Sequence, residues 1–138
     1  MKKKYLASFA LLCILFSCKK SDDCSLSAAN LVGEYQLTAV TENGADVFND
    51  SNYYAACSRD NIYALKSDGS WTVTEGAVLC STPTSLSGVW SFASDTLNAF
   101  QESFRVTDFN CSGFKLNFTI VDPNPANNIV VIQTFVRK

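Results

Sequence analysis

The stretch that decides the fold runs from Cys57 to Trp90 and reads CSRDNIYALKSDGSWTVTEGAVLC followed by STPTSLSGVW. Apolar and polar residues alternate on both sides of Asp68-Gly69, which is typical of two strands joined by a tight hairpin turn. Cys57 and Cys80 stand at the two ends of this predicted hairpin. The stretch contains no recognisable catalytic apparatus, so it indicates a fold rather than a reaction.

The same alternation continues outward from this hairpin to the C-terminus. We expect the other strands at residues 34–42, 88–93, 97–100, 104–106, 114–120 and 129–136. Residues 46–56 are expected to form a loop with a short helix. About eight sequential strands joined by short turns predict an all-β fold, an eight-stranded antiparallel up-and-down barrel, with a β-sandwich as the alternative. An eight-stranded barrel is either filled by side chains or holds one small ligand.

The N-terminus has the pattern of an export signal. Lysines at positions 2–4 precede an apolar run, residues 6–16, that is short for a membrane span. Leu15-Phe16-Ser17-Cys18 resembles the bacterial lipobox, although Phe16 is larger than the residue usually found there. We therefore expect a signal peptide at residues 1–17, lipidation of Cys18, a tether at 18–30 and one domain at 31–138. A plain secretory signal with an incidental cysteine is the alternative.

This interpretation predicts an outer-membrane lipoprotein, held at the membrane by its N-terminal lipid and facing either the periplasm or the cell surface. Ser21-Asp22-Asp23 resembles the short acidic signals that send some gram-negative lipoproteins to the outer leaflet, and a solvated spacer is the alternative. Oligomeric state is not readable from the sequence, and a monomer is expected.

Composition excludes several classes of function. The chain has 11 basic and 13 acidic residues, a net charge of −2 and no histidine. It therefore lacks the basic surface of a nucleic-acid-binding protein and the histidine of serine or cysteine triads. Without histidines or CxxC pairs it also lacks the usual zinc ligands, and no cofactor or metal is expected. Its paired carboxylates fall in the tether, in loops and at strand ends, so we expect a protein that is not an enzyme.

Cysteine usage agrees with an exported protein. Cys24, Cys57, Cys80 and Cys111 remain once the signal is removed and Cys18 carries lipid. An even number of cysteines outside the cytoplasm indicates disulfide bonds, and four cysteines allow three pairings.

Two groups of residues resemble a known family. Leu31-Val32-Gly33-Glu34-Tyr35 resembles the Gly-x-Trp entry to the first lipocalin strand, with Tyr35 in place of the tryptophan. The second group resembles the lipocalin-like lipoproteins of gram-negative bacteria: Cys57-x-x-Asp60, Asp68-Gly69-x-Trp71, Glu75-Gly76, Cys80 and Gly88-Val89-Trp90. The resemblance runs from Leu31 to the C-terminus. It implies a lipocalin-like barrel that binds small apolar molecules, with no particular ligand indicated.

A Cys57–Cys80 bridge has a physical reason beside this resemblance, because these residues flank one hairpin. Closing a loop of that size stabilises a fold by about 3 kcal/mol in the chain-entropy model. Cys24 and Cys111 would then pair with each other and fasten the tether to the turn before residue 114.

Aromatic side chains on the inferred inward face are the candidate ligand-binding residues: Tyr35, Tyr63, Trp71, Trp90, Phe92, Phe104 and Phe118. They either line a cavity or fill the barrel completely. The first case predicts a lipid-anchored binding protein for a small apolar or amphipathic ligand. The second predicts a cell-surface protein-interaction module, or an inhibitor of a hydrolase, that acts through the loops at residues 46–56 and 122–128.

Overall fold

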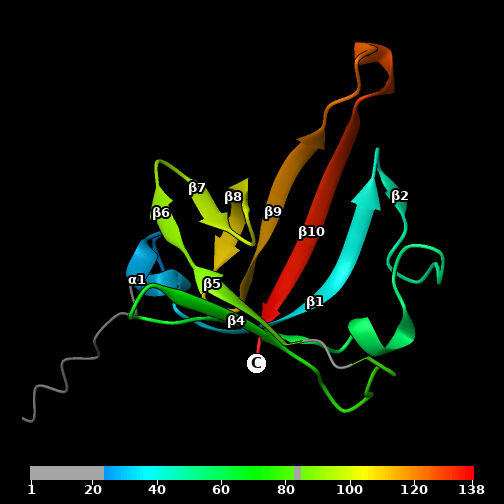
Figure 1. The fold of residues 1–138 in the computed structure, drawn as a ribbon. Helices are drawn as coiled ribbons and strands as arrows, with labels where there is room; N and C mark the ends of the chain where they lie inside the picture. The colour runs from blue at the N-terminus through cyan, green and yellow to red at the C-terminus, as the bar shows by residue number, and fades with distance from the viewer. Residues whose placement is uncertain (1–23, 83–84) are drawn as a thin grey trace, which may run out of the picture.

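The structure is a computed structural model that describes residues 24–82 and 85–138 (Figure 1). Its helical elements are α1 (Ala28–Leu31) and the short 3-10 helices η1 (Ala56–Ser58) and η2 (Pro125–Asn127). Its strands are β1 (Gly33–Glu42), β2 (Ala45–Asp46), β3 (Ile62–Leu65), β4 (Ser70–Thr74), β5 (Ser85–Val89), β6 (Ser91–Ala93), β7 (Thr96–Ala99), β8 (Glu102–Asn110), β9 (Gly113–Ile120) and β10 (Ile129–Arg137). Within the described residues no helix has both the length and the apolar character that a membrane crossing requires.

The strands form an antiparallel, nearly closed barrel in up-and-down order, which confirms the predicted all-β class. The order in the sheet is β5-β4-β3-β1-β10-β9-β8-β7-β6, and β2 pairs only with the end of β1. Pairing of β1 with β10 joins the two ends of the domain. The ends of the sheet, β5 and β6, follow each other in the chain, so the sheet comes almost full circle (Figure 1). This arrangement is consistent with a lipocalin-like fold.

The predicted number of eight strands was wrong because the expected strand at 88–93 is broken. β5 ends at Val89 and β6 starts at Ser91, with Trp90 between them. The backbone N–H of Trp90 donates to Gly69 O at 2.8 Å, and its indole N–H donates to Lys66 O at 2.9 Å. These bonds attach Trp90 to the β3–β4 turn, so the chain turns a corner there and the main path has nine strands.

The loop expected at residues 46–56 contains no helix before Ala56, where η1 begins. The carboxylate of Asp46 accepts a hydrogen bond from the Phe48 N–H, and that of Asp50 accepts one from the Asn52 N–H. Asp side chains that bond the backbone two residues ahead compete with helix formation, so a series of turns replaces the expected helix.

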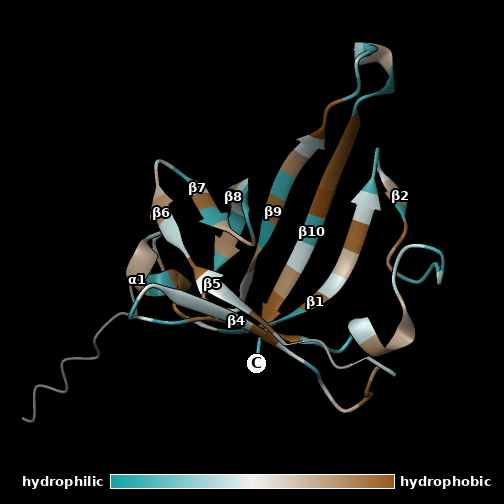
Figure 2. Cartoon of the chain, in the orientation of Figure 1, coloured by the Kyte–Doolittle hydropathy of each residue, from teal (hydrophilic) through white to brown (hydrophobic). Residues whose placement is uncertain are grey.

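The core lies inside the barrel. Fully buried side chains include Tyr35, Leu97 and Leu116 from β1, β7 and β9. Figure 2 shows apolar and polar residues alternating along β9, the pattern that the sequence predicts for a half-buried strand, whereas the first half of β10 is apolar throughout. The β9–β10 hairpin extends beyond the other strands and ends in the loop that holds η2 (Figure 1).

Candidate ligand-binding cavity

A cavity of about 380 Å³ lies inside the barrel. It is bounded by the strands β1, β3, β4, β5, β8 and β10 and by the segment that leads into β3. Its lining residues are Leu37, Tyr53, Tyr54, Ala55, Ser58, Asn61, Tyr63, Val73, Leu86, Phe100, Phe104, Gln133 and Phe135. None of these side chains is charged, so an apolar, uncharged environment surrounds the cavity.

Aromatic rings make up one wall of the cavity, and we call Tyr63, Phe100, Phe104 and Phe135 the aromatic wall. The rings of Tyr63 and Phe135 meet edge to face with centroids 5.2 Å apart, and Tyr63 meets Phe100 at 6.0 Å. Phe100 meets Phe104 at 6.2 Å in the same manner. Edge-to-face contacts of this kind add stability beyond simple burial and hold each ring in one orientation. The wall is therefore a preorganised apolar surface.

Phe100 enters this wall through an unusual turn. Phe100 and Gln101 connect β7 to β8 with φ values of 54° and 67°. This left-handed region is uncommon for residues other than Gly, Asn and Asp, and costs about 1–3 kcal/mol for a bulky side chain. The Phe100 ring lies 4.6 Å from Trp71, a contact that helps to offset this cost.

Residues 53–58 lie at the edge of the cavity, and we call them the rim segment. Tyr53 is 55% exposed, whereas Tyr54 is half-buried with its ring 5.9 Å from that of Phe48. The guanidinium of Arg59 donates to Asn49 O and to Tyr54 O, both at 3.0 Å. Arg59 therefore holds the loop that carries both tyrosines against the start of β3.

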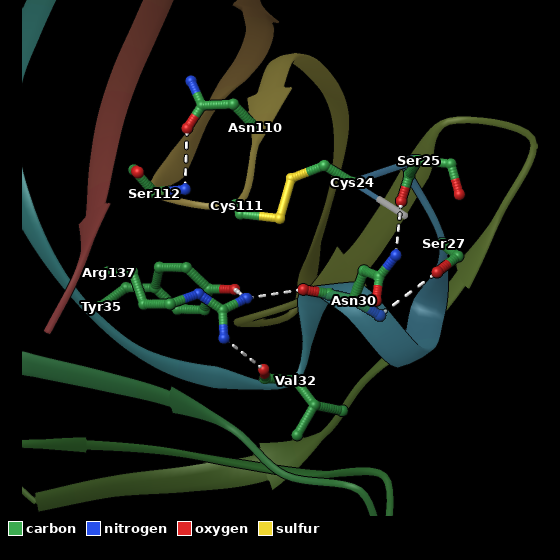
Figure 3. Close-up of a disulfide and its surroundings, with 10 residues drawn as sticks. All are labelled: Cys24, Ser25, Ser27, Asn30, Val32, Tyr35, Asn110, Cys111, Ser112 and Arg137. Atoms are coloured by element: carbon green, nitrogen blue, oxygen red, sulfur yellow. Dashed lines mark hydrogen bonds between the residues drawn. A yellow bond between two sulfur atoms is a disulfide. The ribbon is translucent and has the colours of Figure 1, made fainter. Parts of the chain in front are cut away.

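Two disulfide bonds fasten the barrel, and they pair the cysteines as the hairpin argument predicts. Cys57–Cys80 joins η1 to the loop after β4, so it stabilises the base of the rim segment. Cys24–Cys111 joins the first described residue to the turn between β8 and β9 (Figure 3). Cys18, the predicted lipidation site, lies outside the described residues.

The barrel end where β1 begins is closed by a contact between Tyr35 and Arg137 (Figure 3). The Arg137 guanidinium lies 5.1 Å from the Tyr35 ring centroid and donates to the Tyr35 hydroxyl at 2.8 Å. It also donates to Asn30 O at 2.6 Å and to Val32 O at 3.0 Å, while the Tyr35 hydroxyl donates to Leu31 O. The cavity therefore opens toward the rim segment and not toward α1.

Electrostatics in the barrel favour neutral groups. Burial raises the pKa of the Tyr63 phenol, and the neighbouring Tyr54 adds to this rise. Burial also raises the pKa of Tyr35, while the positive charge of Arg137 acts in the opposite direction. Both phenols stay protonated at neutral pH, because the ordinary tyrosine pKa is already about 10. Across the described parts of the chain, no cluster of three or more His, Cys, Asp or Glu side chains could hold a metal ion.

The structure brings only part of the predicted aromatic set to the cavity. Tyr63 and Phe104 line it. The other predicted side chains pack in or against the core without lining the cavity: Tyr35, Trp71, Trp90, Phe92 and Phe118. Trp71 lies behind Phe100, and Phe118 lies behind Phe104 with ring centroids 5.2 Å apart. Whether any of these residues binds a ligand stays a prediction.

Sequence reasoning missed Asn61, Phe100 and Phe135 as lining residues. Period-two alternation does carry the signal for Asn61, because it immediately precedes β3 and lies two residues before Tyr63, so the alternation extended by one residue puts both on one face. The same alternation indicates Phe135, because it lies four residues after Val131 and therefore on the same face of β10. Phe100 has no such signal, since its ring direction depends on the left-handed turn.

Comparisons of the chain with protein-family models, with curated proteins and with solved structures gave no match.

Proposed function

We propose that this chain is a lipid-anchored, lipocalin-like binding protein that holds a small apolar or amphipathic ligand inside its barrel. The observation that carries this proposal is the uncharged cavity of about 380 Å³ beside the aromatic wall. Small-molecule sites are typically concave, mostly apolar and roughly 300–1,000 Å³ in volume. The cavity fits a small ligand with one to three rings, or a short acyl chain, rather than a large lipid.

The anchor is part of the proposal. Lipidation at Cys18 would place the protein in the outer membrane, facing the periplasm or the cell surface. Cys24 lies at the same end of the barrel as Arg137 (Figure 3), and Figure 1 shows α1, which follows Cys24, across the barrel from the segment between β2 and β3 that holds the rim segment. A tether leaving from this end would leave the cavity opening free to meet a ligand from the solvent.

The alternative function is a protein-interaction module or hydrolase inhibitor with a solid barrel. Exposed apolar side chains at the tip of the β9–β10 hairpin, Ile120 and Val121, and the exposed Tyr53 are the features that favour it. Because cavities reduce the free energy of unfolding, a barrel that binds nothing inside would be more stable without a cavity of this size. The ligand-binding function is therefore the one that we propose.

Native mass spectrometry and probe displacement test this function together. The full chain carrying Cys18→Ser, which lacks the lipidation site, is purified from the periplasm and examined for a co-purifying small molecule. Binding of the neutral fluorescent probe N-phenyl-1-naphthylamine is then measured. Val73→Phe fills the cavity from β4, and Val130→Phe makes the same change on the exposed side of β10, where Val130 is 47% exposed.

The proposal predicts a co-purifying molecule or saturable probe binding. It also predicts that Val73→Phe weakens probe binding at least about tenfold, whereas Val130→Phe leaves it unchanged. Thermal melts of both variants establish that they are folded. No adduct and no probe binding would contradict a ligand-binding function, and equal binding by the two variants would place the probe outside the cavity.

A further inference from the structure

Asn61 is the polar residue that stands out in the cavity lining. It immediately precedes β3 and is only 4% exposed. Among the described residues that are buried, Asn61 is the polar one, and the others that carry a side chain are hydrophobic. Its side-chain oxygen Oδ1 is buried and accepts no hydrogen bond from the protein. The side chain nevertheless lines the cavity.

An unpaired buried amide oxygen is costly. Leaving such a group without a partner destabilises the folded protein, and nine-tenths or more of buried polar groups are paired in folded proteins. Leucine would fill a similar volume at position 61 without this cost. A bound molecule that pairs with the Asn61 amide would therefore stabilise the folded protein.

The other residues that line the cavity limit the class of molecule that can bind there. No lysine, arginine, aspartate or glutamate lines the cavity, so a charged group would lose its hydration there without gaining an ionic partner. Gln133 in β10 is a second amide in the lining. An amide offers both a carbonyl acceptor and N–H donors, and a hydroxyl can donate to the first while it accepts from the second.

We propose that Asn61 makes the cavity selective for neutral ligands that carry a hydroxyl or a comparable uncharged hydrogen-bond donor on an apolar body. Such a ligand places its body against the aromatic wall and its hydroxyl on the Asn61 side chain. The inference rests on the proposed ligand-binding function and specifies the ligand class for the same cavity.

Three ligands that share a naphthalene ring system and differ in the substituent at position 2 test this selectivity: 2-naphthol, its methyl ether 2-methoxynaphthalene, and 2-naphthoate. Each is titrated against N-phenyl-1-naphthylamine bound to the full chain carrying Cys18→Ser. We expect 2-naphthol to displace the probe at about tenfold lower concentration than the ether, which cannot donate a hydrogen bond. We expect 2-naphthoate to be weaker than the ether, because its carboxylate finds no cation in the cavity.

The variant Asn61→Leu should abolish the difference between 2-naphthol and the ether while it keeps or strengthens binding of the ether. Asn61→Ala gives the same comparison if the leucine variant does not fold, and thermal melts establish folding of both. Equal binding of 2-naphthol and the ether to the chain with Asn61 intact overturns the selectivity but leaves ligand binding in place. The same holds if the hydroxyl preference persists without Asn61. Failure of all three ligands and the probe to bind overturns the proposed function as well.

Discussion

Replacing Arg137 with methionine should remove a large part of the stability of the barrel. The guanidinium donates three hydrogen bonds, to Asn30 O, Val32 O and the Tyr35 hydroxyl, and lies over the Tyr35 ring. Hydrogen bonds from a charged donor contribute about 1.5–3 kcal/mol each, and cation–π contacts about 0.5–2 kcal/mol. Methionine keeps much of the apolar stem but leaves two backbone carbonyls without this donor.

The expected loss for Arg137→Met is about 3–5 kcal/mol, because the half-buried guanidinium recovers hydration on unfolding and the bonds act as one unit. Urea unfolding followed by circular dichroism measures this loss. With an m-value of about 1.5 kcal/mol per molar urea, the midpoint should fall by about 2–3 M. Arg137→Lys keeps the charge but loses the planar fork, so it should lose about half as much.

The neighbouring Lys138→Met is the matched control. The Lys138 ammonium donates to the Gln36 side-chain oxygen at 2.9 Å and is exposed, so its loss should cost less than about 0.5 kcal/mol. A loss for Arg137→Met within about 1 kcal/mol of this control would refute the argument that Arg137 locks the closed end of the barrel.

Three further predictions concern the rest of the barrel. Gly88→Ala would place a Cβ atom 2.8 Å from the Trp71 indole, so it should cost about 1–3 kcal/mol in urea unfolding and shift the tryptophan emission. Raised phenol pKa values in the folded state stabilise the protein below the ordinary tyrosine pKa of about 10, so the free energy of unfolding should fall as the pH rises above 10. Tyr63→Phe should reduce this fall in unfolding experiments between pH 8 and 12, and an unchanged slope would contradict the assignment to Tyr63. Arg59→Met removes the hydrogen bonds to Asn49 O and to Tyr54 O in the rim segment, so stopped-flow measurements should show about three- to tenfold faster release of the probe, and the Tm should fall.

Local sequence patterns predicted the strands and hairpins well because their causes are local. Asp68-Gly69 gives a turn because Gly69 adopts a φ of 81°, and the Asp68 carboxylate accepts hydrogen bonds from the Ser70 N–H and hydroxyl. The alternation in β9 follows from burial of one face of the sheet. The break between β5 and β6 at Trp90 has a different cause. It depends on hydrogen bonds from Trp90 to the carbonyl groups of Lys66 and Gly69, which come close to Trp90 only in the folded barrel.

The cavity could not be located from the sequence for a similar reason. Aromatic residues on the inward face of a barrel can pack tightly or leave space, and the difference depends on turn geometry and side-chain rotamers. Phe100 shows this, since its left-handed turn sends the ring against Trp71 and makes Trp71 part of the packing rather than of the lining. The contact between Arg137 and Tyr35 is also not local, because only the paired ends of β1 and β10 bring the two residues together.

The Cys24–Cys111 bond also determines how the domain responds to mechanical load. If the proposed lipid at Cys18 anchors the chain, a force on the domain is applied through Cys24. Because the bond joins Cys24 directly to the β8–β9 turn, a pull between the two ends of the chain passes across the sulfur atoms to Cys111. Residues 25–110 then lie outside the stretched path, and only β9 and β10 can be drawn out. The part of the barrel that holds the rim segment and Asn61 is therefore shielded from direct extension.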